Sequence, residues 1–129
     1  QKNINNYENI IILKIEKKEN VKAKSINFSK SLLNNLNIEK KDNIYFYQTV
    51  TINNKIVTTL IDINIKDFVD QSLYLLIDKN IFFLAEIKLH QFDNKKVIVR
   101  PFQQSFSSFH INKAQLNIYG KALWQGCEL

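Results

Sequence analysis

Short runs of β-branched and aromatic residues, separated by clusters of Asn, Asp and Lys, are the feature that most restricts how this chain can fold. Tyr45, Phe46 and Tyr47 lie in one such run, and Phe82 and Phe83 lie in another. Residues of these types favour strands, and the polar clusters between them favour turns. The sequence therefore predicts a mainly β protein.

The spacing of apolar residues locates the individual elements. Leu32, Leu33 and Leu36 share a helical face and Ser29 can serve as an N-cap, which predicts one short helix at residues 29–36. The remainder indicates seven or so strands in a curled, barrel-like sheet, in a single domain of residues 1–129 with its core at about 10–124. The strand-forming ranges are 10–16, 21–28, 44–51, 55–63, 73–77, 81–91, 95–100 and 115–124.

Turn signals connect some of these ranges. The loop at residues 78–80 and the Asp93-Asn94 pair predict that residues 73–100 form a three-strand meander. Residues 102–114 are expected to be irregular, with their Phe rings folded back onto the sheet. Gly120, inside the last strand, is expected at a bulge or at a close backbone approach.

Composition excludes several classes of function. With 2 Gly, 1 Pro and 1 Cys in 129 residues, a Gly-rich phosphate loop, a Pro-rich linker, a disulfide framework and a Cys-rich zinc site are ruled out. The net charge is +6, but Asn, Ile and Lys supply 53 residues, as an A+T-rich genome would encode. We therefore attribute part of the Lys excess to composition bias and not to an anionic partner.

The ends of the chain and its apolar runs bear on location. The chain begins at Gln1 and contains no Met, so we expect it to be the C-terminal part of a longer protein. No signal peptide or membrane-spanning run is visible, and a cytoplasmic location is expected.

Few residues offer catalytic or metal-binding chemistry. His90 and His110 have only Asp93 nearby as a third ligand, which favours surface histidines over a metal site. Ser108 beside His110 could form a nucleophile–base pair, but it lacks the glycines of a nucleophile elbow. We predict no metal and no cofactor.

Several stretches nevertheless follow one familiar pattern. Residues 118–124 read Ile-Tyr-Gly-Lys-Ala-Leu-Trp, residues 26–29 read Ile-Asn-Phe-Ser, and hydrophobic runs follow at 57–62, 73–76, 81–87 and 97–101. This succession resembles the C-terminal domain of LexA-like and phage-repressor-like proteins, which have a Ser-Lys self-cleaving peptidase fold. The resemblance covers roughly residues 26–124.

The chain departs from that family where the family's chemistry lies. The family's Gly-Asp-Ser-Met segment would fall near residues 47–50, where Tyr47, Gln48 and Thr49 precede a valine. The general-base lysine would fall at Ala85. A serine nucleophile needs a neutral lysine to remove its proton. Thr49 could replace the serine but would still lack a base, so the resemblance implies a domain without peptidase activity.

What the resemblance implies is a non-catalytic regulatory and dimerisation domain of a repressor-like transcriptional regulator. DNA would be bound by a separate N-terminal unit, and the dimer would bring two such units onto adjacent half-sites. Leu116, Ile118 and Tyr119 are the expected interface residues of a homodimer; no membrane or small-molecule partner is predicted. The alternatives are a small β-barrel that binds nucleic acid or a protein directly, and a hydrolase using Ser108 and His110.

Overall fold

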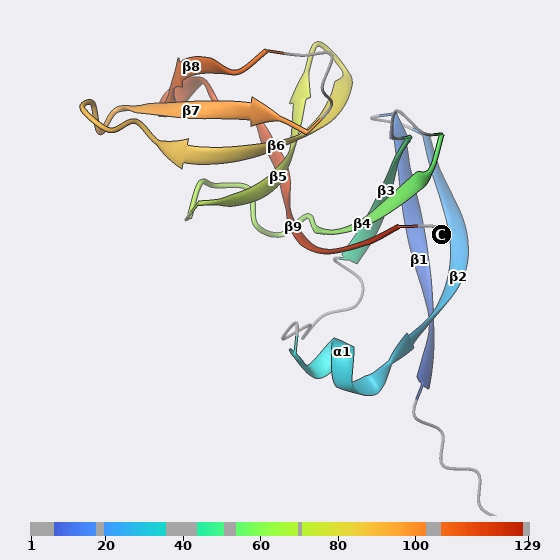
Figure 1. The fold of residues 1–129 in the computed structure, drawn as a ribbon. Coiled ribbons are helices and arrows are strands. Elements are labelled where there is room, and N and C mark those ends of the chain that lie inside the picture. Colours follow the sequence, from blue (N-terminus) through green and yellow to red (C-terminus); the bar gives the residue numbers. More distant parts are fainter. Residues whose placement is uncertain are drawn as a thin grey trace, which may run out of the picture.

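The computed structural model describes residues 7–17, 20–35, 44–50, 54–69, 71–102 and 107–127. In these ranges the chain forms nine strands and one short α-helix (Figure 1). The elements are β1 (Tyr7–Lys17), β2 (Asn20–Ser29), α1 (Lys30–Asn35), β3 (Ile44–Val50), β4 (Ile56–Asp62), β5 (Ser72–Asp78), β6 (Ile81–Leu89), β7 (Lys96–Pro101), β8 (Phe109–Asn112) and β9 (Ile118–Cys127). The prediction of a mainly β protein is confirmed. Leu36, which the sequence placed in the helix, lies outside the described residues.

All nine strands belong to one sheet, in the order β2-β1-β3-β4-β9-β5-β6-β7-β8. Neighbouring strands run antiparallel except for β1 and β3, which are parallel. The last strand of the sequence therefore lies in the middle of the sheet. β9 joins the β1–β4 half to the β5–β8 half (Figure 1).

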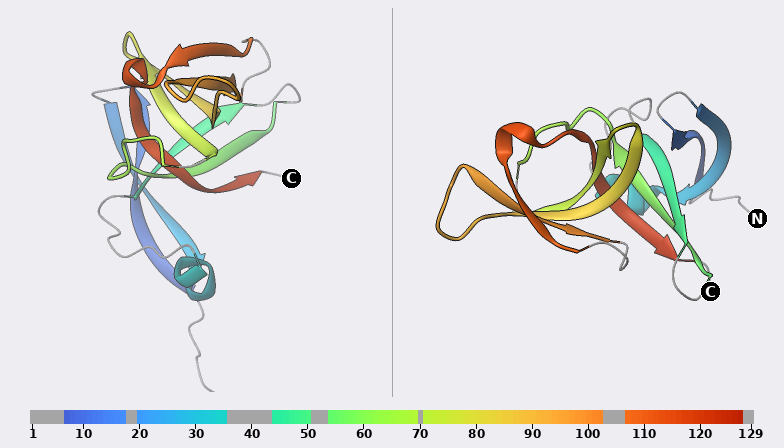
Figure 2. Two further views of the ribbon diagram at one scale, coloured as in Figure 1. Left: turned by 90° about the vertical axis from the view of Figure 1, so that its left-hand side faces the viewer. Right: turned by 90° about the horizontal axis from the view of Figure 1, so that it is seen from above.

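The sheet curls strongly but stays open. Seen from above, β5 to β8 and the start of β9 curve around a common interior (Figure 2). β8 leads through a 3₁₀ turn at Lys113–Gln115 into β9, but both sides of β9 are already occupied, by β4 and by β5. Within the described ranges no ladder joins the edge strands β2 and β8, so closure into a barrel is not confirmed.

The β5–β6–β7 meander predicted for residues 73–100 is confirmed. Lys79 and Asn80 form the two-residue turn between β5 and β6, with φ of 51° and 67°. Positive φ at both positions gives the turn the twist that a tight hairpin needs, and asparagine tolerates it well.

The segment at residues 102–114 is more regular than predicted. Its residues 109–112 form β8, which pairs Val99 with Phe109 and Val97 with Ile111. A strand of four residues carries too little alternation to stand out in the sequence. Phe102 and Phe109 remain 38% and 40% exposed, so their rings are not fully folded back, and residues 103–106 lie outside the described ranges.

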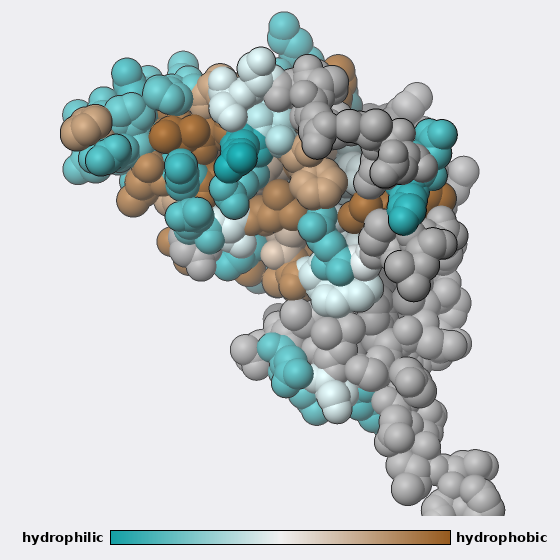
Figure 3. All heavy atoms as spheres, viewed as in Figure 1, coloured by the Kyte–Doolittle hydropathy of each residue, from teal (hydrophilic) through white to brown (hydrophobic). Residues whose placement is uncertain are grey.

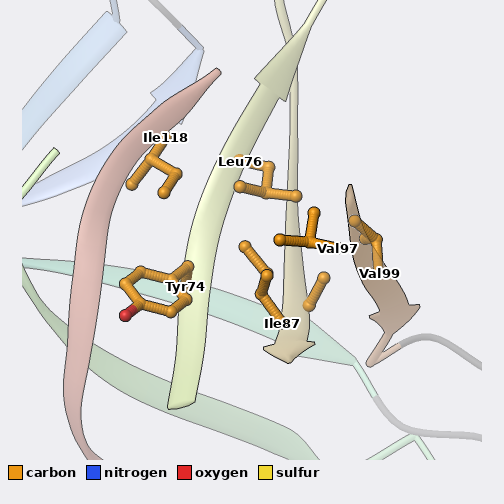
Figure 4. Packing of buried hydrophobic residues seen from close by; sticks show 7 residues of the cluster. Tyr74, Leu76, Ile87, Val97, Val99 and Ile118 are labelled. Carbon is orange, nitrogen blue, oxygen red and sulfur yellow. The ribbon is translucent and has the colours of Figure 1, made fainter. Parts of the chain in front are cut away.

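Two hydrophobic cores lie on opposite faces of β5 and β6. The meander core consists of Tyr74, Leu76, Ala85, Ile87, Val97, Val99 and Ile118 (Figure 4). The tyrosine core consists of Ile61, Leu75, Phe82 and Leu84, with Tyr45, Tyr47 and Tyr119 packed against it. Successive residues of a strand point to opposite faces, so both faces of β5 and β6 are buried.

Gly120 lies where two strands approach closely, as predicted. A Cβ atom there would stand 2.5 Å from Ile61 Cγ2 and 2.8 Å from the Asp62 carbonyl oxygen. The β5–β9 register also shifts beside it, between Leu75 and Leu76. Only glycine allows β4 and β9 this spacing, and the bulge lets β9 turn from one half of the sheet to the other.

Candidate functional site

Tyr47 links the two halves of the molecule. It pairs with Thr59 of β4 in the ladder, and its side chain crosses to β6. There its hydroxyl donates a hydrogen bond of 3.1 Å to the Phe82 carbonyl oxygen, with the two ring centroids 6.4 Å apart. Burial raises the pKa of the Tyr47 hydroxyl above its ordinary 10.0. The segment of the expected nucleophile is thus in contact with the strand of the expected base.

Thr49 carries the one aliphatic hydroxyl of β3 and is therefore the candidate substitute nucleophile, because the hydroxyls of Tyr45 and Tyr47 are phenolic. Its side chain is 5% exposed, and its Oγ1 atom has no hydrogen-bond partner among the residues that the structure describes. The neighbouring Gln48 donates from Nε2 to Thr58 Oγ1 at 3.2 Å and so is engaged elsewhere. A general base must lie within hydrogen-bond reach of the proton that it removes. Thr49 therefore has a buried hydroxyl, and within the described ranges no base lies in hydrogen-bond reach of it.

Ala85 does not face Tyr47 or Thr49. It is fully buried in the meander core, and its ladder partners are Tyr74 of β5 and Pro101 of β7. Phe82, which accepts the hydrogen bond from Tyr47, contributes its side chain to the tyrosine core on the other face. The strands of the two expected dyad positions therefore meet, but the side chains do not.

The three expected interface residues also lie inside the sheet. Ile118 is 7% exposed in the meander core, and Leu116 packs against that core. Tyr119 packs against the tyrosine core, with its ring 4.9 Å from that of Phe82 at 80°. Burial raises the pKa of the Tyr119 hydroxyl above its ordinary 10.0, with a smaller electrostatic contribution from the nearby Tyr45. Leu116 and Tyr119 remain partly exposed, whereas Ile118 is almost wholly buried, so the interface at these three residues stays a prediction.

One hollow opens beside the β6–β7 ladder. This Glu86–Arg100 pocket has a volume of about 420 Å³ and is lined by Leu73, Glu86, Arg100, Pro101, Phe102 and Gln125. Glu86 and Arg100 stand opposite each other in the ladder, and Gln125 donates from Nε2 to Thr59 Oγ1 at 3.0 Å. The pocket can orient a polar group, and its described lining contains no Ser, Thr, Cys or Lys side chain.

A second hollow lies at the β5–β6 turn. This lysine pocket has a volume of about 330 Å³ and is lined by Lys66, Ile77, Lys79, Asn80, Asn117, Ile118 and Tyr119. The lining contains two lysines and two asparagines but no carboxylate. Sequence reasoning missed this set, because its members come from three segments that only the strand order brings together.

The two histidines are close in space although twenty residues separate them. Their ring centroids lie 4.9 Å apart. His90 Nδ1 accepts hydrogen bonds from the backbone N–H groups of Phe92 and Asp93, both at 3.2 Å. In a neutral ring with Nδ1 as acceptor, Nε2 carries the proton and cannot ligate a metal. In the part of the chain that the structure describes, no three His, Cys, Asp or Glu residues are placed to hold one.

Ser108 and His110, the alternative hydrolytic pair, are both exposed on or beside the edge strand β8. The aromatic neighbour of His110 is His90, and no cavity described above includes Ser108.

Comparison with known proteins adds no family. Neither a family model nor a curated protein matches the chain. Among the described residues, no helix is both long enough and apolar enough to cross a membrane.

Proposed function

We propose that this chain is a non-catalytic regulatory and dimerisation domain of a repressor-like transcriptional regulator. The DNA-reading unit of the regulator would be a separate domain. This chain would raise the effective concentration of a second reader by pairing with its own copy. No step in this role requires an active site.

The observation that carries the non-catalytic assignment is the environment of Ala85. Its side chain is fully buried beside Tyr74, on the face of β6 that lies away from Tyr47. A lysine there would bring a charge into an apolar core. Among the described residues no hydrogen-bond partner of Thr49 Oγ1 is found, which supports a domain that works without the dyad.

The edge strand β8 is the surface best placed for self-association. It pairs with β7 on one side, no other described strand pairs with it, and Phe109 on it is 40% exposed. A free edge can pair with the same edge of a second copy, and two-fold symmetry lets each copy supply the same residues. Hydrophilic and hydrophobic residues are intermixed on the visible surface of the β5–β8 half (Figure 3).

The experiment is light scattering coupled to size-exclusion chromatography at micromolar protein. The dimer has twice the 15.2 kDa mass of one chain, and Phe109→Lys returns it to the monomer because a charge then faces its own copy. Phe92→Lys is the matched control, because Phe92 is 87% exposed at a turn outside β8. A chain that stays monomeric at high micromolar concentration, or a dimer that Phe109→Lys leaves intact, contradicts the proposed dimer.

A second measurement addresses catalysis. A serine-directed fluorophosphonate probe should leave the chain unlabelled, and prolonged incubation at alkaline pH should give no cleavage. Labelling that Ser108→Ala abolishes would favour the hydrolase instead.

A further inference from the structure

The lysine pocket is built on rigid parts of the sheet. Lys79 and Asn80 are fixed by the two-residue turn between β5 and β6. On the opposite wall, the Asn117 carbonyl oxygen accepts a hydrogen bond of 3.0 Å from the Ile77 N–H, which ties the start of β9 to β5. Backbone ladders therefore set the distance between the two asparagines, and Lys66 joins them from the β4–β5 connection.

The electrostatics of the pocket favour an anion. Lys66 and Lys79 are exposed at its mouth, and the amide groups of Asn80 and Asn117 add neutral donors. Two acids adjoin the lining residues in sequence. Asp78 follows Ile77 in β5, so alternation directs its side chain to the other face. Asp67 follows Lys66, is exposed and does not line the pocket. The carboxylate of Asp62 accepts a hydrogen bond from the Asn64 N–H at 2.9 Å and does not line the pocket. The lining thus carries two positive charges with no internal counter-charge.

The walls of the lysine pocket can contact an apolar part of a ligand. Ile77 and Ile118 are partly or fully buried, and the Tyr119 ring is held edge-on against Phe82. A volume of about 330 Å³ lies at the lower end of the range of small-molecule sites, which suits one ring system with a charged group.

We propose that the lysine pocket binds a small phosphate monoester carried on a flat ring, the chemical class of a nucleoside monophosphate. A phosphate monoester carries nearly two negative charges at pH 7, which match the two lysines, whereas a carboxylate carries one. Lysine binds phosphate as a point charge, and the asparagine amides can donate to the remaining oxygens. The ring lies along Ile77 and Tyr119.

This site goes beyond the proposed function, because it gives the domain a small-molecule effector. It stands whether or not the chain dimerises. The pocket shares Ile118 and Tyr119 with the two cores, so an occupied pocket would stabilise the junction of β5 and β9.

The test is an NMR titration of the full chain with adenosine monophosphate, adenosine and inorganic phosphate as separate probes. The monophosphate should shift the side-chain amide signals of Asn80 and Asn117, with tighter binding than either of the other probes. Lys66→Gln and Lys79→Gln should each weaken its binding about fivefold, as expected for partly solvated charge pairs, and the double variant should weaken it about twentyfold. Raising the salt concentration should weaken binding as well.

Lys113→Gln is the matched control, because Lys113 is an exposed lysine in the 3₁₀ turn outside the pocket and its loss should leave binding unchanged. Equal affinity for adenosine and its monophosphate would overturn the proposal. Binding that Lys113→Gln weakens as much as Lys66→Gln does would also overturn it, as would the absence of shifts at Asn80 and Asn117.

Discussion

The two faces of the β5–β6 hairpin differ in what they can do. The face in the meander core is closed: Tyr74, Ala85 and Ile87 are fully buried among aliphatic neighbours (Figure 4). The opposite face holds tyrosines that are only partly buried, and the Glu86–Arg100 pocket and the lysine pocket open beside it. One strand pair thus supplies stability on one side and polar chemistry on the other.

The difference bears on the proposed absence of peptidase activity. A lysine placed at position 85 would lie in the meander core, whereas Tyr47, on the strand of Thr49, packs against the tyrosine core on the other face of β6. Binding functions are possible on the tyrosine side, where polar groups reach solvent.

The largest expected effect comes from a charge on the closed face. Ala85→Lys should destabilise the protein by about 3–5 kcal/mol, because it buries an unpaired ammonium in an apolar core. Glu86→Lys, one residue further and on the other face, should cost about 1 kcal/mol or less, through repulsion of Arg100. Urea denaturation followed by circular dichroism measures both, and equal losses would contradict the difference between the faces.

A methyl group between β4 and β9 tests how tightly the two halves of the sheet are joined. Gly120→Ala should cost about 1–3 kcal/mol, because the new Cβ meets the Asp62 backbone, which cannot move away alone. Gly126→Ala is the control: its Cβ would meet only the Trp124 ring, which can rotate. The midpoint of thermal unfolding should therefore fall further in Gly120→Ala than in Gly126→Ala. A larger fall in Gly126→Ala would contradict a close approach of β4 and β9 at Gly120.

The hydroxyl of Tyr47 should make stability depend on alkaline pH. Its folded-state pKa is raised above the ordinary 10.0, so the folded state favours the neutral hydroxyl. That contribution is fully present below about pH 10 and is lost as pH rises through the folded-state pKa. Tyr47→Phe should cost about 1 kcal/mol at pH 7, through loss of the hydrogen bond to Phe82, and should flatten the decline above pH 10. If the free energy of unfolding declined equally above pH 10 in both proteins, ionisation of Tyr47 would not be coupled to unfolding.

The smallest effect on stability is expected from removing the hydroxyl of Thr49. Thr49→Val should leave stability unchanged or raise it by up to about 1 kcal/mol, because it removes a buried polar atom that has no partner. Thr59→Val should instead destabilise by about 1 kcal/mol, because it breaks the bond from Gln125. A loss of stability in Thr49→Val comparable to that in Thr59→Val would show that Thr49 has a partner in solution.

Local patterns predicted the parts of this fold that depend on neighbouring residues. The meander, the turn at Lys79 and Asn80 and the close approach at Gly120 all follow from residue types within a few positions. The position of β9 in the middle of the sheet depends on long-range pairing and left no local signal. The interface expected on Leu116, Ile118 and Tyr119 therefore falls among residues that pack against the cores.

The candidate site shows the same limit. In β6 both Leu84 and Ala85 are buried, so the sequence lacks the alternation that would tell which of them faces Tyr47. The lysine pocket unites residues 66, 79–80 and 117, which only the β5–β9 pairing brings near. The face on which Ala85 lies and the lysine pocket both depend on how distant strands pair, which the local sequence does not specify.

The measurement that tests the separation of the two faces most directly is a nuclear Overhauser spectrum that resolves the Ala85 methyl group. Cross-peaks from this methyl to the Tyr74 ring, and none to the Tyr47 ring or the Thr49 methyl, are the expected result. A cross-peak between the Ala85 methyl and either Tyr47 or Thr49 would contradict it, because the two dyad positions would then face each other.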